Sequence, residues 1–104
     1  MDFRLINLCG ASSISRVANV YEIQDFQGVP WSKYKIKVLE RSKDFLAVPN
    51  VAVRTAEGAV EWISGIGRTE AEALQDAVSQ ISEALSARGI WRPEDFEWSD
   101  PHEF

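Results

Sequence analysis

The fold is decided by residues 65–89, GIGRTEAEALQDAVSQISEALSARG. Thr69 and Glu72 have the T-x-x-E spacing of a capping box, in which each side chain satisfies a backbone N–H of the first helical turn. Apolar residues then recur at spacings of four, three and four, which is one stripe of a helix: Leu74, Val78, Ile81 and Leu85. Arg88 suits the negative end of the helix dipole, and the glycine after it is a typical stop. The sequence therefore predicts an amphipathic helix over residues 70–88.

Three shorter runs before this helix have the alternation of β-strands. The first run has one apolar face and one basic face, because Tyr34, Ile36 and Val38 alternate with lysines. These lysines are Lys33, Lys35 and Lys37. A strand would place all three on one face within about 14 Å, either as a solvated face or as an anion-binding patch for a nucleic acid or for the chain's own acidic tail.

The second run spans residues 46–55 and contains Pro49, which has no N–H to donate and marks an edge, a bulge or a strand start. A glycine-containing turn leads into the third run, residues 59–64, where Trp62 and Ile63 point to opposite faces. The Gly-Ile-Gly segment that follows is expected to break this strand. Short connections between neighbouring runs favour an antiparallel meander.

The N-terminal part of the chain permits two interpretations. Ser12-Ser13 can cap a helix that carries Val17, Val20 and Tyr21 on one side, and this helix is the favoured prediction. Its β-branched residues lower helix propensity, so a strand from Val17 to Ile23 is the alternative. The residues before it form an extra strand or a tether.

The order helix, three strands, helix invites a comparison with a known family. Residues 21–30, YEIQDFQGVP, together with Tyr34-Lys35-Ile36, look like the first helix, Pro-containing turn and first strand of the double-stranded RNA-binding domain. Residues 65–73, GIGRTEAEA, are similar to that family's glycine-paired strand end and Ala-rich second helix. From about Ser13 to Arg88 the chain resembles this family.

The resemblance implies an α+β fold in the order α-β-β-β-α, with a three-stranded antiparallel sheet packed on two helices. It divides the chain into an N-terminal strand or tether over residues 1–12, a domain over residues 13–89 and a C-terminal extension over residues 90–104. This extension is acidic and aromatic: residues 92–104 carry a formal net charge of −4, whereas residues 1–91 carry −1.

The chain departs from the family where RNA is bound. In the family, lysines at the start of the second helix grip phosphates, but Glu70 and Leu74 stand at these positions. The family's histidine-bearing loop is replaced by residues 41–44, Arg-Ser-Lys-Asp. Ordinary duplex RNA binding is therefore not expected, and a weak or non-standard mode is the alternative. Its residues are Lys33, Lys35, Lys37, Arg41, Lys43 and Arg68.

A second resemblance ranks below the first. Residues 44–49, DFLAVP, and residues 69–74, TEAEAL, are similar to antitoxin domains that pair with small RNA-cleaving toxins. That pattern has three strands and one helix, and the run at residues 59–64 lies outside it. This resemblance implies an antitoxin-like regulator.

Catalysis is poorly supported by the sequence. His102 lies among acids near the end of the sequence, and Cys9 has the character of a small buried hydrophobe with no histidine where a base is needed. No Cys/His set has zinc spacing, and Gly65-x-Gly67 lacks the third glycine of a dinucleotide fingerprint. We therefore expect no enzyme, cofactor, metal site or small-molecule substrate.

Composition sets the remaining expectations. The 104 residues are 45% hydrophobic and 26% charged, which is typical of one globular domain and excludes global disorder. No apolar run approaches the ~18 residues of a membrane span, and Met1–Arg4 do not resemble the start of a signal peptide. The lone Cys9 excludes an internal disulfide and fits a cytoplasmic protein.

The function that we expect is therefore a non-catalytic binding module, a regulator, an inhibitor or a self-associating domain. Its partner is another protein or a second copy, with duplex RNA as the alternative. The large aromatics either cover the domain's own sheet or first helix, or anchor a partner. The expected protein-binding residues are Trp62, Trp91, Phe96, Trp98 and Phe104.

Overall fold

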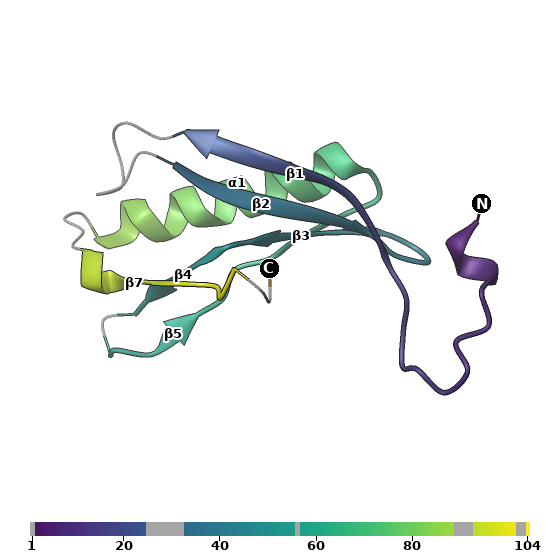
Figure 1. Ribbon diagram of the computed structural model, residues 1–104. Coiled ribbons are helices and arrows are strands. Elements are labelled where there is room, and N and C mark those ends of the chain that lie inside the picture. The colour runs from purple at the N-terminus through teal and green to yellow at the C-terminus, as the bar shows by residue number, and fades with distance from the viewer. Residues whose placement is uncertain (1, 25–32, 56, 89–92, 102–103) are drawn as a thin grey trace.

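The computed structural model describes residues 2–24, 33–55, 57–101 except 89–92, and 104. Its described part is an α+β fold of one α-helix and two antiparallel sheets, of four and three strands (Figure 1). The elements are η1 (Phe3–Leu5), β1 (Arg16–Gln24), β2 (Lys33–Glu40), β3 (Phe45–Pro49), β4 (Val51–Arg54), β5 (Val60–Glu61), β6 (Gly65–Gly67), α1 (Glu70–Arg88), η2 (Pro93–Asp95) and β7 (Phe96–Trp98). The α+β prediction is confirmed.

The larger sheet has the strand order β1-β2-β3-β6, and α1 lies across one of its faces (Figure 1). Every second residue of β2 points at this helix, so Tyr34, Ile36 and Val38 are buried as the alternation predicted. Ala47 of β3 lies opposite Val38 and is fully buried. The core therefore lies between the sheet and α1.

The helix begins and ends as predicted, at Glu70 and Arg88. The backbone N–H of Glu72 donates to Thr69 Oγ1 at 3.1 Å, and the Glu72 carboxylate accepts from the backbone N–H of Arg68 at 2.8 Å. The cap thus uses the two predicted side chains, and the Glu72 carboxylate accepts its bond from Arg68, the residue before Thr69. The buried stripe consists of Ala73, Ala77, Ile81 and Leu85.

Small residues on both sides let α1 approach β6 closely. A Cβ added to Gly65 would collide with the backbone oxygen of Ala73 and the backbone nitrogen of Ala77. A Cβ on Gly67 would lie 2.5 Å from both the Ala73 nitrogen and the Glu72 Cβ. The Gly-Ile-Gly segment was expected to break a strand, but it forms β6 and pairs with β3. Leu74 and Val78, which were predicted to belong to the apolar stripe, are only partly buried because the alanines take the closest contact.

The predicted first helix is wrong, since residues 16–24 form strand β1 at one edge of the larger sheet. Tyr21 pairs with Ile36 and Ile23 with Tyr34, so the aromatic and β-branched residues of this segment satisfy a two-residue period against β2. The α-β-β-β-α order is therefore not observed, because a strand stands where the first helix was expected. The four strands of the larger sheet all precede α1. Residues 25–30, which carried part of the RNA-binding-domain resemblance, lie outside the described residues.

The smaller sheet has the order β5-β4-β7 and joins distant parts of the chain. The predicted run at residues 46–55 divides at Asn50, whose N–H donates to the Lys35 oxygen while its Oδ1 accepts from the Lys35 N–H. Only Val60–Glu61 of the predicted third strand are a strand. Residues 96–98 of the C-terminal extension pair with β4, so this part of the extension belongs to the domain.

Candidate docking surface on the exposed face of the larger sheet

The face of the larger sheet opposite α1, here called the open face, carries an apolar row that crosses all four strands. The strand register places Val17 opposite Leu39, Leu39 opposite Leu46, and Leu46 opposite Ile66. Their sequence neighbours point at the helix, so these four side chains point away from it. Val17 and Ile66 are each 55% exposed, and the two leucines between them are half-buried. The apolar row therefore runs between two exposed ends.

Three lysines of β2 stand beside this row on the same face. The pattern that predicted them is confirmed: Lys33, Lys35 and Lys37 alternate with the buried residues of β2, and we call them the lysine stripe. Lys33 Nζ lies 3.6 Å from Glu22 Oε1 of β1. Lys35 makes no ion pair with any residue that the structure describes.

Lys37, the third lysine, is in contact with the end of the sequence. Its Nζ donates to the backbone oxygen of Phe104 at 2.9 Å and lies 4.8 Å from the centroid of the Phe104 ring. Val20 and Val48 flank Lys37 in the register, so this part of the face combines a cation with apolar neighbours. One predicted protein-binding residue, Phe104, thus lies against the chain's own lysine stripe.

The other predicted aromatics have different positions. Phe96 is 7% exposed and belongs to the core, so it is not available on the surface. Trp62 and Trp98 are 52% and 44% exposed and line a shallow cavity of about 500 Å³ together with Glu97, Ser99 and Asp100. Trp91 lies outside the described residues. The interpretation that the extension covers the domain's own sheet is therefore correct for Phe96.

The six predicted RNA-binding residues are not brought together. Glu40, Phe45 and Gly67 lie side by side in the register, so the 41–44 turn and Arg68 share one end of the sheet. Lys33 is at the far end of β2, about 25 Å away at the rise of an extended strand. The Arg41 guanidinium makes two bonds of 2.6 Å to the Asp44 carboxylate. These bonds raise the pKa of Arg41 and lower that of Asp44.

The start of α1, where the resemblance called for lysines, is occupied by a structural acid. Glu70 Oε1 accepts from Asn19 Nδ2 at 2.7 Å and from the Tyr21 hydroxyl at 2.9 Å. The hydrogen bond to Glu70 raises the pKa of Tyr21, with a smaller contribution from desolvation. Glu70 therefore joins β1 to the helix, a role that no local sequence pattern predicted.

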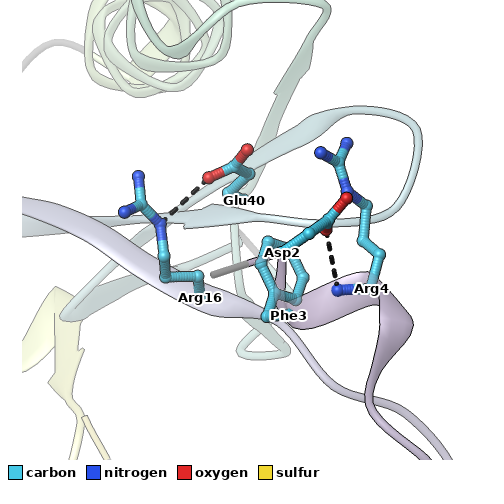
Figure 2. A pocket seen from close by; sticks show the side chains of 5 residues that line it. All are labelled: Asp2, Phe3, Arg4, Arg16 and Glu40. Carbon is cyan, nitrogen blue, oxygen red and sulfur yellow. Dashed lines mark hydrogen bonds and ion pairs between the residues drawn. The ribbon is translucent and has the colours of Figure 1, made fainter.

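A second hollow, of about 420 Å³, lies where η1 meets the sheet, and Figure 2 shows its lining. Arg16 Nε pairs with Glu40 Oε2 at 3.0 Å, and Arg4 Nε pairs with Asp2 Oδ1 at 2.9 Å. The bonds from Arg4 lower the pKa of Asp2. Phe3 is buried at its floor. The four charged side chains that line this hollow therefore pair with one another.

The remaining reactive groups among the described residues do not assemble into a site. Cys9 is exposed, contrary to expectation, and its N–H donates to Asn7 Oδ1 at 2.9 Å. Among the described residues no three His, Cys, Asp or Glu side chains cluster in a way that could hold a metal ion. His102 lies outside the described ranges. Within those ranges, no helix combines the length and apolar character needed to cross a membrane.

Comparison with protein-family models, with curated proteins and with solved structures found no match to this chain. These comparisons therefore support neither the RNA-binding-domain resemblance nor the antitoxin resemblance. Over its described residues the structure is an α+β fold whose larger sheet is covered by α1 on one face.

Proposed function

We propose that this protein is a non-catalytic binding module that docks on another protein through its open face. The observation that carries the proposal is the apolar row, which crosses four strands and is more than half exposed at both ends. Single exposed apolar side chains are ordinary on a protein surface, but a contiguous set is typical of an interaction site. Val20, 53% exposed, extends the row along β1.

The face is a better docking surface than the edge of the same sheet. Strand β1 is an edge strand with unpaired backbone groups, but its register shifts between Val17 and Asn19, which is a bulge. Arg16 and Glu22 add charges along this strand. Bulges and charges are the usual protection of an edge against pairing with another chain. Burial of apolar side chains, rather than strand addition, is therefore the proposed mode of contact.

The lysine stripe specifies the chemistry of the partner. A partner surface that buries the apolar row would place its own edge over Lys33 and Lys35. Carboxylates at that periphery would complement the stripe, hasten encounter and fix orientation. We therefore propose a partner with an apolar centre bordered by acidic residues.

The proposal is tested with the double variant V17S/I66S. Because both side chains are more than half exposed, the variant should keep the wild-type free energy of unfolding to within about 1 kcal/mol. The solution mass is measured first, and a partner recovered by pull-down is then titrated quantitatively. We expect at least a tenfold loss of affinity, in the dimer or in the complex. L5S, at an 83% exposed site outside the open face, is the matched control. Unchanged affinity in V17S/I66S would refute the proposal.

The strand order favours an antitoxin-like regulator as the kind of module. That resemblance has three strands and one helix, whereas the RNA-binding-domain resemblance begins with a helix. In this chain the four strands of the larger sheet precede α1. An inhibitor that covers an RNA-cleaving enzyme is a docking protein of the proposed kind. The test is RNA cleavage by a co-purified partner, which should be suppressed by the wild-type chain and restored with V17S/I66S.

Duplex RNA binding is the second candidate, and the observation that favours it is the exposed lysine stripe. A phosphate backbone bound by three lysines would give an affinity that falls steeply with salt. The separation of Arg41 and Arg68 from the stripe weakens this candidate. Titration of a duplex RNA at low and high salt decides it, because absence of binding at low salt removes it.

A further inference from the structure

We infer that the lysine stripe is a binding site for an acidic peptide segment that carries an aromatic residue, and that the described residues of the chain's own C-terminal segment, 99–101 and 104, compete for it. The inference rests on the proposed function, since it names the ligand class at one part of the same face. It starts from the two contacts of Lys37 with Phe104, a hydrogen bond of 2.9 Å and a ring contact of 4.8 Å across 67 positions of sequence.

The path of the chain holds this segment beside the stripe. After β7 ends at Trp98, the N–H of Ser99 donates to the Asn50 oxygen at 2.9 Å. Asn50 is itself bound to the backbone of Lys35 by two hydrogen bonds. The N–H of Phe104 donates to the Asp100 oxygen at 3.1 Å. Ser99 is therefore tied to β2 through Asn50, and Phe104 contacts Lys37 of the same strand.

Phe104 shows part of the chemistry that the site accepts. It offers an aromatic ring and a backbone oxygen to one ammonium group, and the sequence that contains it, SDPHEF, has two acidic residues. Val20 and Val48, in register with Lys37, supply an apolar bed for an aromatic side chain. Lysine over an aromatic face is attracted by the negative face of the ring. A partner segment with an aromatic residue and carboxylates would make the same contacts.

Two features leave the site open to such a ligand. A cation–π contact at an exposed site changes an equilibrium only about two- to fivefold. Lys37 and Phe104 are only partly buried, so the internal contact is displaceable. Lys35 has no ion pair within the described part of the chain, and Lys33 is held only by the exposed Glu22 at 3.6 Å. A ligand that brings its own carboxylates gains interactions with these two lysines that the internal segment does not make in the described residues.

The experiment uses the full chain and a fluorescently labelled peptide, SDPHEF, a copy of residues 99–104. Binding is measured by anisotropy to the wild type and to F104A, which removes the internal ring. We expect F104A to bind the peptide about two- to fivefold more tightly than the wild type, because that is the change expected for loss of one cation–π contact. K37Q in the F104A background should weaken binding by a similar factor or more, whereas K43Q, a matched loss of charge in the β2–β3 turn, should not. F104L, which keeps an apolar side chain but lacks the ring, is the second variant and should act as F104A does.

Equal affinity of wild type, F104A and F104L would overturn the inference, as would an unchanged affinity when K37Q is added to F104A. Binding of a duplex RNA without binding of the peptide would also overturn it and make the stripe a phosphate site. These outcomes are distinct from failure of the proposed function. If V17S/I66S loses its partner while the peptide does not bind, the docking face stands and only this inference fails. If the peptide binds as expected while V17S/I66S keeps its affinity, the apolar row is refuted and the peptide site stands.

Discussion

The hydroxyl of Tyr21 donates a 2.9 Å hydrogen bond to the carboxylate of Glu70, and this bond joins the edge strand β1 to the first turn of α1. Asn19 donates to the same oxygen at 2.7 Å. A carboxylate at a helix N-terminus is also favoured by the helix dipole. The residue that distinguishes this chain from an RNA-binding domain therefore has a structural reason to be acidic, because a lysine there would lose both donors.

The hydrogen bond between Tyr21 and Glu70 predicts a raised pKa for the phenol of Tyr21. The bond to Glu70 raises the pKa of Tyr21 above its ordinary value of 10.0. Since the folded-state pKa is the raised one, the stabilising contribution is complete below the unfolded pKa and is lost as pH rises through the folded value. E70Q should move the pKa of Tyr21 back towards 10. The measurement is an NMR titration of the Tyr21 ring above pH 8, with E72Q as control. An identical titration curve in E70Q would contradict the prediction.

The same segment explains why the first helix was predicted wrongly. Val17, Val20 and Tyr21 fit a helical spacing, whereas Tyr21 and Ile23 fit a strand that pairs with Ile36 and Tyr34. A short sequence satisfies both periods, and only partners far along the chain decide between them. The helix α1 was predictable because its cap, stripe and stop agree locally. The strands around it depend on register, which the local pattern does not contain.

In the candidate site, too, some features follow from the local sequence and others depend on strand register. The lysine stripe was predictable because its residues alternate within one strand. The apolar row was not, since Leu39, Leu46 and Ile66 each come from a different strand and become neighbours only through the register. The extension was predicted as acidic and aromatic, but the core position of Phe96 follows from its pairing with Val53, more than 40 residues earlier.

Close packing of β6 against α1 predicts that Gly65 tolerates no side chain. In G65A the new Cβ would meet the helix backbone at Ala73 and Ala77, neither of which can move without displacing the helix. We expect a loss of about 3 kcal/mol or more in the free energy of unfolding, measured by urea denaturation. G58A is the control: nothing lies near its Cβ, and its φ of +87° should cost about 1–2 kcal/mol. A smaller loss in G65A than in G58A would refute this account.

The Arg41–Asp44 pair predicts an acid-side titration. The two bonds from Arg41 lower the pKa of Asp44 below 3.8, and a depressed folded-state pKa gives stability that is present above the unfolded pKa and lost as pH falls. R41Q should raise the pKa of Asp44 towards 3.8. NMR titration of the side-chain carboxyl carbon between pH 2 and about 6 follows this change directly. R16Q is the control, because Arg16 pairs with Glu40 and its loss should leave the pKa of Asp44 unchanged. An unchanged pKa of Asp44 in R41Q would count against the Arg41–Asp44 pair.

The position of the C-terminal extension in the smaller sheet predicts opposite consequences for two neighbouring aromatics. Phe96 is buried against Val53 in the core, so F96A should lower the free energy of unfolding by about 3–5 kcal/mol. Trp98 is nearly half exposed, and W98A should cost about 1 kcal/mol. Denaturation monitored by far-UV circular dichroism measures both without relying on tryptophan fluorescence. Amide hydrogen exchange adds a second readout, because loss of the Phe96 anchor should expose the β4 amides that pair with β7. Equal stability of F96A and W98A would mean that residues 96–98 do not belong to the core sheet in solution, since burial alone distinguishes the two side chains here.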